Sequence, residues 1–243
     1  MDITTETIDC DGHGGFDCVR YRFDYGGEDR ALLDELRDDG ERLAEGSDGR
    51  MARDSSRGRS ADTQSVDGIS GVLAEWVWKD WLTRTAERRD TGADVFQDDE
   101  WDTPQEQVDI TVDRGRGESA AVEVRSSFPY TGAEKAVCTH FDVIGWYNNE
   151  VKKREIRKDY YVRVLFPFHK SNFWTEFESN SFDVYLAGGA PRAMLEDSPH
   201  AEDKPFTPHW DDSSDGGQRG TYRVISPIAN AMDTPAITDE MVA

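Results

Sequence analysis

The sequence predicts an α/β sandwich around a mixed central sheet, with its core elements in the order helix, two strands, helix, strand. Three patterns carry this prediction. Residues 67–89 have an apolar stripe at helical spacing. Residues 107–128 alternate apolar and polar side chains on both sides of a Gly/Arg turn, which is typical of a β-hairpin. Residues 160–168 form a continuous aromatic and β-branched run, which indicates a buried strand.

The other core elements follow from shorter patterns. The long helix is expected to begin at Asp67, a favourable N-cap residue. A second helix is expected at 133–151, where apolar residues recur without a clear period, and the acidic stretch 94–107 is expected to be surface. Further along the chain we expect a strand at 182–187, a short helix at 191–196, an acidic loop at 197–218 and a strand at 221–225.

The N-terminal part is predicted as an appendage to this core. Residues 1–27 contain two alternating segments around a glycine-rich turn, which predicts a hairpin. Residues 31–44 predict a helix that is interrupted at Asp38-Asp39-Gly40. We therefore divide the chain into a hairpin-plus-helix appendage at 1–45, a flexible linker at 46–66, a core domain at 67–227 and a loosely held tail at 228–243.

The composition restricts the environment and the partners. The net charge of −22 is spread along all 243 residues, which is typical of a halophilic protein in a salt-rich cytoplasm, where charge repulsion is screened. An ordinary acidic protein is the alternative. The acidity excludes a broad, nonspecific nucleic-acid binder, because such binding needs clustered cations. No apolar run reaches the roughly 18 residues of a membrane helix, and the N-terminus lacks a signal-peptide pattern, so we expect a cytoplasmic protein without a membrane partner.

The cysteines and histidines give no recognisable site. Cys10, Cys18 and Cys138 are irregularly spaced, so we expect reduced thiols and neither a disulfide framework nor a zinc site. The five histidines lack HxH or HExxH spacing. There is no P-loop and no GxGxxG, and therefore no nucleotide cofactor is expected.

Two acidic residues lie inside the apolar strands of the predicted hairpin. On a period-two reading, Asp109 and Glu123 point to the faces opposite the apolar residues of their strands, where they can converge. Neighbouring carboxylates repel each other and are stabilised by a cation between them.

This arrangement, Asp109 followed fourteen residues later by Glu123-Val124-Arg125, resembles the metal-binding core of the PD-(D/E)XK (restriction endonuclease-like) nuclease superfamily. The resemblance covers about residues 68–168 and implies a restriction-endonuclease-like fold. It implies further that Asp109, Glu123 and the carbonyl of Val124 bind Mg²⁺ or Mn²⁺, and that the protein hydrolyses phosphodiester bonds in DNA.

The resemblance also assigns two supporting residues. Glu75, on the helix before the hairpin, is placed to supply a further contact to the metal or to water, although it is equally well read as an acid at the helix edge. Arg125 stands where the family usually has lysine. Arginine binds phosphate with two hydrogen bonds but stays protonated, so it is a poor general base.

Three explanations of Arg125 remain open: the metal alone activates the water, another lysine such as Lys79 or Lys135 acts, or the protein binds without cutting. A further alternative is a surface hairpin whose acids are halophilic decoration and whose arginine pairs with one of them.

A basic cluster favours DNA as the partner. Five cations fall within seven residues, and two more occupy the hairpin turn: Lys152, Lys153, Arg154, Arg157 and Lys158, with Arg114 and Arg116. A basic helix end without DNA contacts is the alternative. The prediction is therefore a magnesium-dependent endodeoxyribonuclease of DNA defence, restriction or repair, acting as a homodimer or with a partner subunit of a defence system. The alternative is an inactive module of the same fold that binds DNA or a partner subunit.

Overall fold

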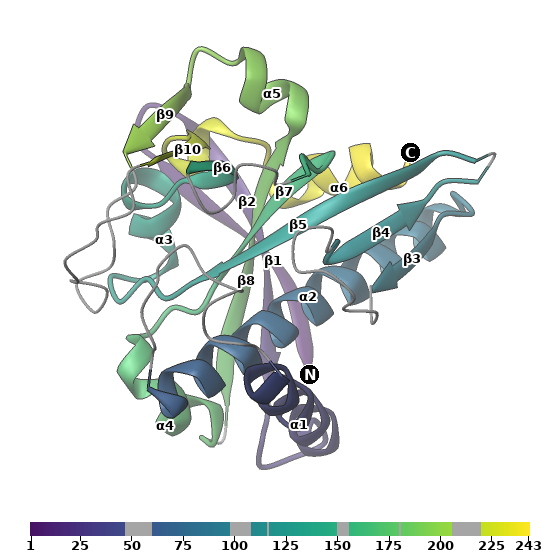
Figure 1. Ribbon diagram of the computed structural model, residues 1–243. Coiled ribbons are helices and arrows are strands. Elements are labelled where there is room, and N and C mark those ends of the chain that lie inside the picture. The colour runs from purple at the N-terminus through teal and green to yellow at the C-terminus, as the bar shows by residue number, and fades with distance from the viewer. Residues whose placement is uncertain (47–59, 98–107, 116, 150–155, 180, 206–219) are drawn as a thin grey trace.

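The computed structural model describes residues 1–46, 60–97, 108–115, 117–149, 156–179, 181–205 and 220–243 (Figure 1). The protein is α/β, as predicted, and contains two sheets. The larger is a mixed seven-stranded sheet in the order β1-β2-β8-β7-β5-β4-β3, formed by β1 (Asp2–Cys10), β2 (Gly14–Phe23), β3 (Asp94–Gln97), β4 (Ile110–Asp113), β5 (Ser119–Ser127), β7 (Tyr160–Leu165) and β8 (Phe182–Pro191). The smaller has the order β6-β10-β9 and contains β6 (Val143–Asn149), β9 (Ala201–Pro205) and β10 (Gly220–Ile225).

Helices cover the large sheet and join its strands. The α-helices are α1 (Arg30–Gly46), α2 (Ala61–Arg89), α3 (Ala133–Lys135), α4 (Phe173–Phe177), α5 (Arg192–Asp197) and α6 (Thr234–Val242). Shorter helical turns are η1 (Ala136–His140), which is a π-helix, and the 3₁₀ segments η2 (Lys170–Asn172) and η4 (Ile228–Asn230). Among the described residues, no helix is both long enough and apolar enough to cross a membrane.

The predicted hairpin is present as β4 and β5, with Ile110 opposite Val122 and Asp113 opposite Ser119. Strand β5 continues past Ile110, the first residue of β4, and pairs in parallel with β7, which places Glu123 opposite Tyr161 and Arg125 opposite Arg163. The alternating apolar pattern predicted this hairpin correctly because both strands bury one side against a helix. Ile110, Val112 and Val122 are fully buried. The central part of the sheet is therefore β4-β5-β7.

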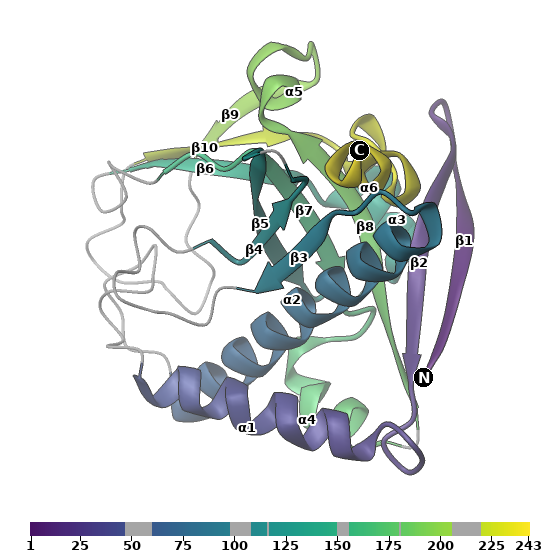
Figure 2. The same cartoon turned by 90° about the vertical axis from the view of Figure 1, so that its right-hand side faces the viewer.

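Helix α2 is the main covering helix. Figure 2 shows it running diagonally across one face of the large sheet, with α1 beside it. The helix begins about two turns earlier than predicted, because Ser60 rather than Asp67 is its N-cap: the Ser60 hydroxyl accepts a hydrogen bond from the Thr63 backbone at 3.1 Å. Asp67 instead forms an ion pair with Lys170. Part of the predicted linker thus belongs to the helix, and residues 47–59 lie outside the described part.

Helix α1 runs without interruption through Asp38-Asp39-Gly40, so the predicted break is wrong. Gly40 serves helix packing: a Cβ there would lie 2.4 Å from the Ile69 Cα, and a Cβ on Gly68 would lie 2.3 Å from the Gly40 carbonyl oxygen. The two glycines let the backbones of α1 and α2 touch, which no larger residue permits.

Both ends of the chain are integrated into the fold. The N-terminal hairpin does form, but it is not an appendage to the sandwich: β2 pairs with β8 along Val19–Phe23, and so extends the large sheet. The C-terminal segment was expected to be loose, yet α6 buries Ile237, Met241 and Val242. Within it, the Thr238 hydroxyl accepts a hydrogen bond from the indole of Trp81 at 3.0 Å.

The helix predicted at 133–151 is wrong for residues 141–149. Among the described residues of this stretch the chain forms α3 and η1, and Val143–Asn149 then forms β6, because this segment pairs with β10. Strands β3 and β9 lie inside stretches that were expected to be acidic surface and loop. Both are short strands whose formation depends on a neighbouring strand and not on their own side chains.

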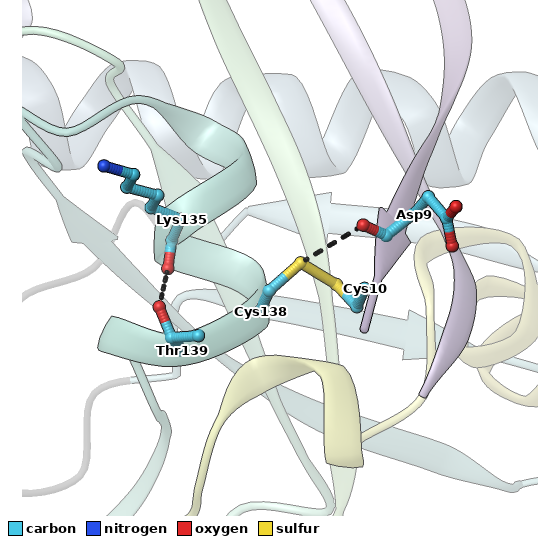
Figure 3. Close-up of a disulfide and its surroundings, with 5 residues drawn as sticks. All are labelled: Asp9, Cys10, Lys135, Cys138 and Thr139. Carbon is cyan, nitrogen blue, oxygen red and sulfur yellow. Dashed lines mark hydrogen bonds between the residues drawn. A yellow bond between two sulfur atoms is a disulfide. The ribbon is translucent and has the colours of Figure 1, made fainter. Parts of the chain in front are cut away.

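The expectation of reduced thiols is wrong for two cysteines. Cys10, at the end of β1, and Cys138, in η1, form a disulfide with their Cα atoms 5.2 Å apart (Figure 3). The third cysteine, Cys18, is buried as a free thiol. The sequence could not indicate this pairing, because the two cysteines are 128 residues apart.

The large sheet separates two apolar layers. One lies between the sheet and α1, α2, α4 and α6, and includes Leu73, Trp78 and Val162. The other lies on the opposite face, below η1, α5, η4 and the small sheet, and includes Tyr161 and Leu165. Successive residues of β7 therefore point into different layers, which explains why the sequence of this strand is almost continuously apolar.

Candidate functional site

Three acidic residues from separate elements come together at the start of β4. Asp109 directly precedes β4, Glu123 lies on β5 and Glu75 lies on α2. Asp109 is 8% exposed, and its Oδ2 accepts a hydrogen bond from the Val124 backbone at 2.7 Å. Burial, followed by the charges of Glu123 and Glu75, raises the pKa of Asp109 well above its ordinary value. The structure thus brings together the acids that the sequence singled out.

Glu75 is positioned by the adjacent edge of the sheet. It lies on the buried side of α2 and is 9% exposed. Its Oε2 accepts a hydrogen bond from the side-chain amide of Gln97, the last residue of β3, at 2.9 Å. Strand β3, which the sequence did not predict, therefore fixes one member of the acidic cluster.

Arg125 contacts the cluster directly. Its Nη2 lies 2.9 Å from Glu123 Oε1, and the two side chains are only 18% and 13% exposed. The guanidinium also lies over the ring of Tyr147, 5.0 Å from its centroid. The alternative that the arginine pairs with one of the acids is therefore realised, but in a half-buried cluster of charges and not on an exposed hairpin.

A second arginine, Arg163, was missed by the sequence interpretation. It lies on β7 opposite Arg125, is 1% exposed and donates a hydrogen bond from Nη2 to Ser127 Oγ at 2.6 Å. Burial, with the nearby charge of Arg125 as a further cause, lowers the pKa of Arg163 to about 10. The available signal was the single charge within an otherwise apolar strand, because buried charges are rare and costly.

The predicted DNA-binding residues within the described ranges have structural partners. Arg114 donates to the backbone carbonyls of Glu240 and Met241, both at 2.9 Å, and to the Tyr160 hydroxyl, so it holds the end of α6. Arg157 lies 3.0 Å from Glu196.

Lys158 is buried, with only 3% of its surface exposed, although the sequence pattern predicted it to contact phosphate. The other predicted contacts, Arg116, Lys152, Lys153 and Arg154, lie outside the described residues.

The acidic cluster offers oxygen donors of the kind that a divalent cation binds. In the described part of the chain, no group of three His, Cys, Asp or Glu side chains has the arrangement of a metal-ligand set. The donors nevertheless fit a hard cation chemically, since carboxylates and a backbone carbonyl are what Mg²⁺ binds. Burial is the main cause of the raised pKa of Asp109, and the charges of Glu123 and Glu75 raise it further; such a cation would offset the repulsion from these two charges. Asp109, Glu123 and the Val124 carbonyl are the groups that would hold it.

A hollow elsewhere on the surface does not compete with this cluster. An open depression of about 580 Å³ is lined by Ile3, Trp81, Arg84, Glu87 and Arg88 and shares no residue with the acids.

Comparison with protein-family models, curated proteins and solved structures finds no match.

Proposed function

We propose that the protein is a metal-dependent endonuclease of the PD-(D/E)XK type, which hydrolyses phosphodiester bonds in DNA during defence, restriction or repair. The proposal depends on one observation, the convergence of Glu75 and Glu123 on the buried carboxyl of Asp109. Support comes from where these acids lie: one on the helix before the strands, one at the start of a strand, and one two residues before Arg125 on the next strand. These are the positions that the family resemblance implies.

Each residue then has a defined part in the reaction. Asp109, oriented by the Val124 backbone, and Glu123 would hold Mg²⁺ or Mn²⁺ together with the Val124 carbonyl. When bound, such a cation lowers the pKa of a coordinated water and stabilises charge on the phosphate. Glu75, held by Gln97, supplies a further negative group beside Asp109. Arg125 binds the phosphate oxygens and does not act as the base, since arginine stays protonated.

A second function is favoured by the ion pair between Arg125 and Glu123. A carboxylate already bound to a guanidinium is a weaker metal ligand, and an inactive protein of the same fold that binds DNA or a partner subunit would tolerate such a pair. This alternative predicts DNA or protein binding without cleavage.

The test is cleavage of supercoiled plasmid at high KCl with Mg²⁺, Mn²⁺ or EDTA. The variants are Asp109→Asn and Glu123→Gln, with Glu118→Gln as the matched control, because Glu118 is an exposed acid in the turn of the same hairpin. We expect metal-dependent nicking by the natural sequence and by Glu118→Gln, and its loss in the other two variants. Cleavage that persisted in both Asp109→Asn and Glu123→Gln would refute the proposed site. No cleavage by any variant would favour the binding module.

A further inference from the structure

We propose that Arg125 is an exchangeable counter-ion of the acidic cluster: its guanidinium holds Glu123 while the cluster lacks a divalent cation, and transfers to a phosphate oxygen when a divalent cation binds. This inference rests on the proposed function and adds a step to it. It assigns Arg125 two successive partners, Glu123 first and phosphate second, and makes binding of the metal depend on release of the first.

The contact between Arg125 and Glu123 has the character of a specific internal ion pair. Its 2.9 Å length and the low exposure of both side chains separate it from the solvated pairs elsewhere on the protein, such as Arg30 with Asp34 at 3.7 Å, where the arginine is 65% exposed. The same carboxylate is the proposed metal ligand. A guanidinium and a divalent cation therefore compete for Glu123, and their mutual repulsion prevents both from binding it fully.

Arg163 prevents the Arg125 guanidinium from moving toward β7. The two arginines lie opposite each other on parallel strands, and Arg163 is anchored by its hydrogen bond to Ser127. Because like charges repel strongly at low exposure, the Arg125 guanidinium cannot move deeper between the strands. Burial is the main cause of the lowered pKa of Arg163, and the charge of Arg125 lowers it further, in the direction that this repulsion requires. Displacement by a metal must therefore move Arg125 away from Arg163, which acts as a positioning residue.

The Arg125 guanidinium can rotate while it stays stacked on the ring of Tyr147. A planar guanidinium over an aromatic face keeps that contact while its hydrogen-bonding edge rotates from one acceptor to another. The edge that pairs with a carboxylate also matches two phosphate oxygens. The exchange thus explains the departure from lysine, whose ammonium lacks this flat face.

The exchange makes metal and phosphate binding cooperative. Phosphate draws Arg125 from Glu123 and so strengthens the metal site, and by linkage the metal strengthens phosphate binding by the same factor. The metal affinity of the free protein is correspondingly weakened. Removing the guanidinium is expected to increase that affinity by roughly tenfold, because a unit of repulsion next to the ligand disappears.

The test is calorimetric titration of the full chain with Mn²⁺ in the absence of DNA, at a constant high KCl concentration that suppresses diffuse binding to the acidic surface. The variants are Arg125→Gln, Glu123→Gln and Arg30→Gln. Arg30 is the matched control because it also pairs with an acid and lies over an aromatic ring, that of Tyr25 at 5.5 Å. We expect one site in the natural sequence, about tenfold tighter binding in Arg125→Gln, no change in Arg30→Gln and loss in Glu123→Gln.

The outcomes separate this inference from the proposed function. If the natural sequence binds Mn²⁺ through Glu123 but Arg125→Gln binds no more tightly, the exchange is overturned and the metal site stands. If neither the natural sequence nor Arg125→Gln shows a saturable site, the metal site fails and the exchange fails with it.

A measurement on the unaltered protein guards against a variant that does not fold. The Nε–H signal of Arg125 in ¹⁵N NMR should shift on addition of Mg²⁺, whereas that of Arg30 should not. A signal of Arg125 that stayed fixed at saturating Mg²⁺ would overturn the exchange.

Discussion

Replacing Asp109 by asparagine is expected to stabilise the metal-free protein at neutral pH, even though it removes a residue of the candidate site. The amide has nearly the same size and keeps an oxygen that can accept the 2.7 Å hydrogen bond from the Val124 backbone. It removes a charge that is 8% exposed and lies beside Glu123 and Glu75. Residues of functional sites often carry such a stability cost.

The sign of the pH dependence follows from the pKa of Asp109, which lies well above its ordinary value of 3.8 in the folded protein. At pH values well below 3.8 the carboxyl is protonated in both states, and the charge has no effect. As the pH rises, the unfolded chain loses this proton first, so the folded state loses stability until the pH exceeds the folded-state pKa. The penalty is then constant, at about 1.4 kcal/mol for each unit of pKa difference.

The expected gain is smaller than this penalty, because a hydrogen bond to an amide oxygen is weaker than one to a carboxylate by about 1 kcal/mol. We expect a net increase in the free energy of unfolding of about 1–3 kcal/mol at pH 7.5. At roughly 3 °C per kcal/mol for a chain of this size, Tm should rise by about 3–9 °C.

The assay is thermal unfolding followed by circular dichroism in EDTA at constant KCl, between pH 5 and pH 8. The advantage of Asp109→Asn should shrink toward acidic pH. With saturating Mn²⁺ the order should reverse, because ligand binding stabilises only the natural sequence. Glu118→Gln controls for the loss of one acid from a chain of net charge −22. A variant no more stable than the natural sequence at pH 7.5 would refute the electrostatic argument.

Three further predictions concern the fold. Cys138→Ser should lower the free energy of unfolding by about 2–4 kcal/mol, because the Cys10–Cys138 bond constrains a long loop of the unfolded chain. It should also abolish the effect of dithiothreitol on Tm. The control Cys18→Ala should leave the response to reductant intact. Gly40→Ala should destabilise the protein by about 1–3 kcal/mol in urea denaturation, despite the higher helix propensity of alanine, because its Cβ would meet Ile69. The control is Gly71→Ala in α2, which should be neutral or stabilising because its Cβ would meet nothing within 4 Å. Arg114→Met should lower the free energy of unfolding by about 1–3 kcal/mol and increase amide hydrogen exchange in α6, because it removes hydrogen bonds to the carbonyls of Glu240 and Met241. Unchanged exchange in α6 would contradict this role of Arg114.

Local patterns predicted those parts of the structure that depend on local burial. The β4–β5 hairpin was predictable because Ile110, Val112 and Val122 lie at the period-two apolar positions of their strands and are all buried. Asp109 and Glu123 stood out for the same reason, as acids within two predicted strands whose other face is apolar.

What failed depends on partners distant in the sequence. Gly40 reads as a helix breaker until Ile69 of the neighbouring helix is seen against it. Arg163 reads as an isolated charge until Ser127 and Arg125 are found on the adjacent strand. Strand β3 and the Cys10–Cys138 bond likewise exist only because the fold brings separate segments together.

The disulfide has a topological consequence for the acidic cluster. Glu75, Asp109, Glu123 and Arg125 all lie between Cys10 and Cys138, and therefore within a single covalent ring of the chain. A protease that cuts one peptide bond anywhere in this ring produces two fragments that the disulfide still links, so all four residues stay in one covalent molecule. The nicked protein would migrate as one species without reductant and as two fragments with it, so the ring can keep the site assembled after a break in the backbone.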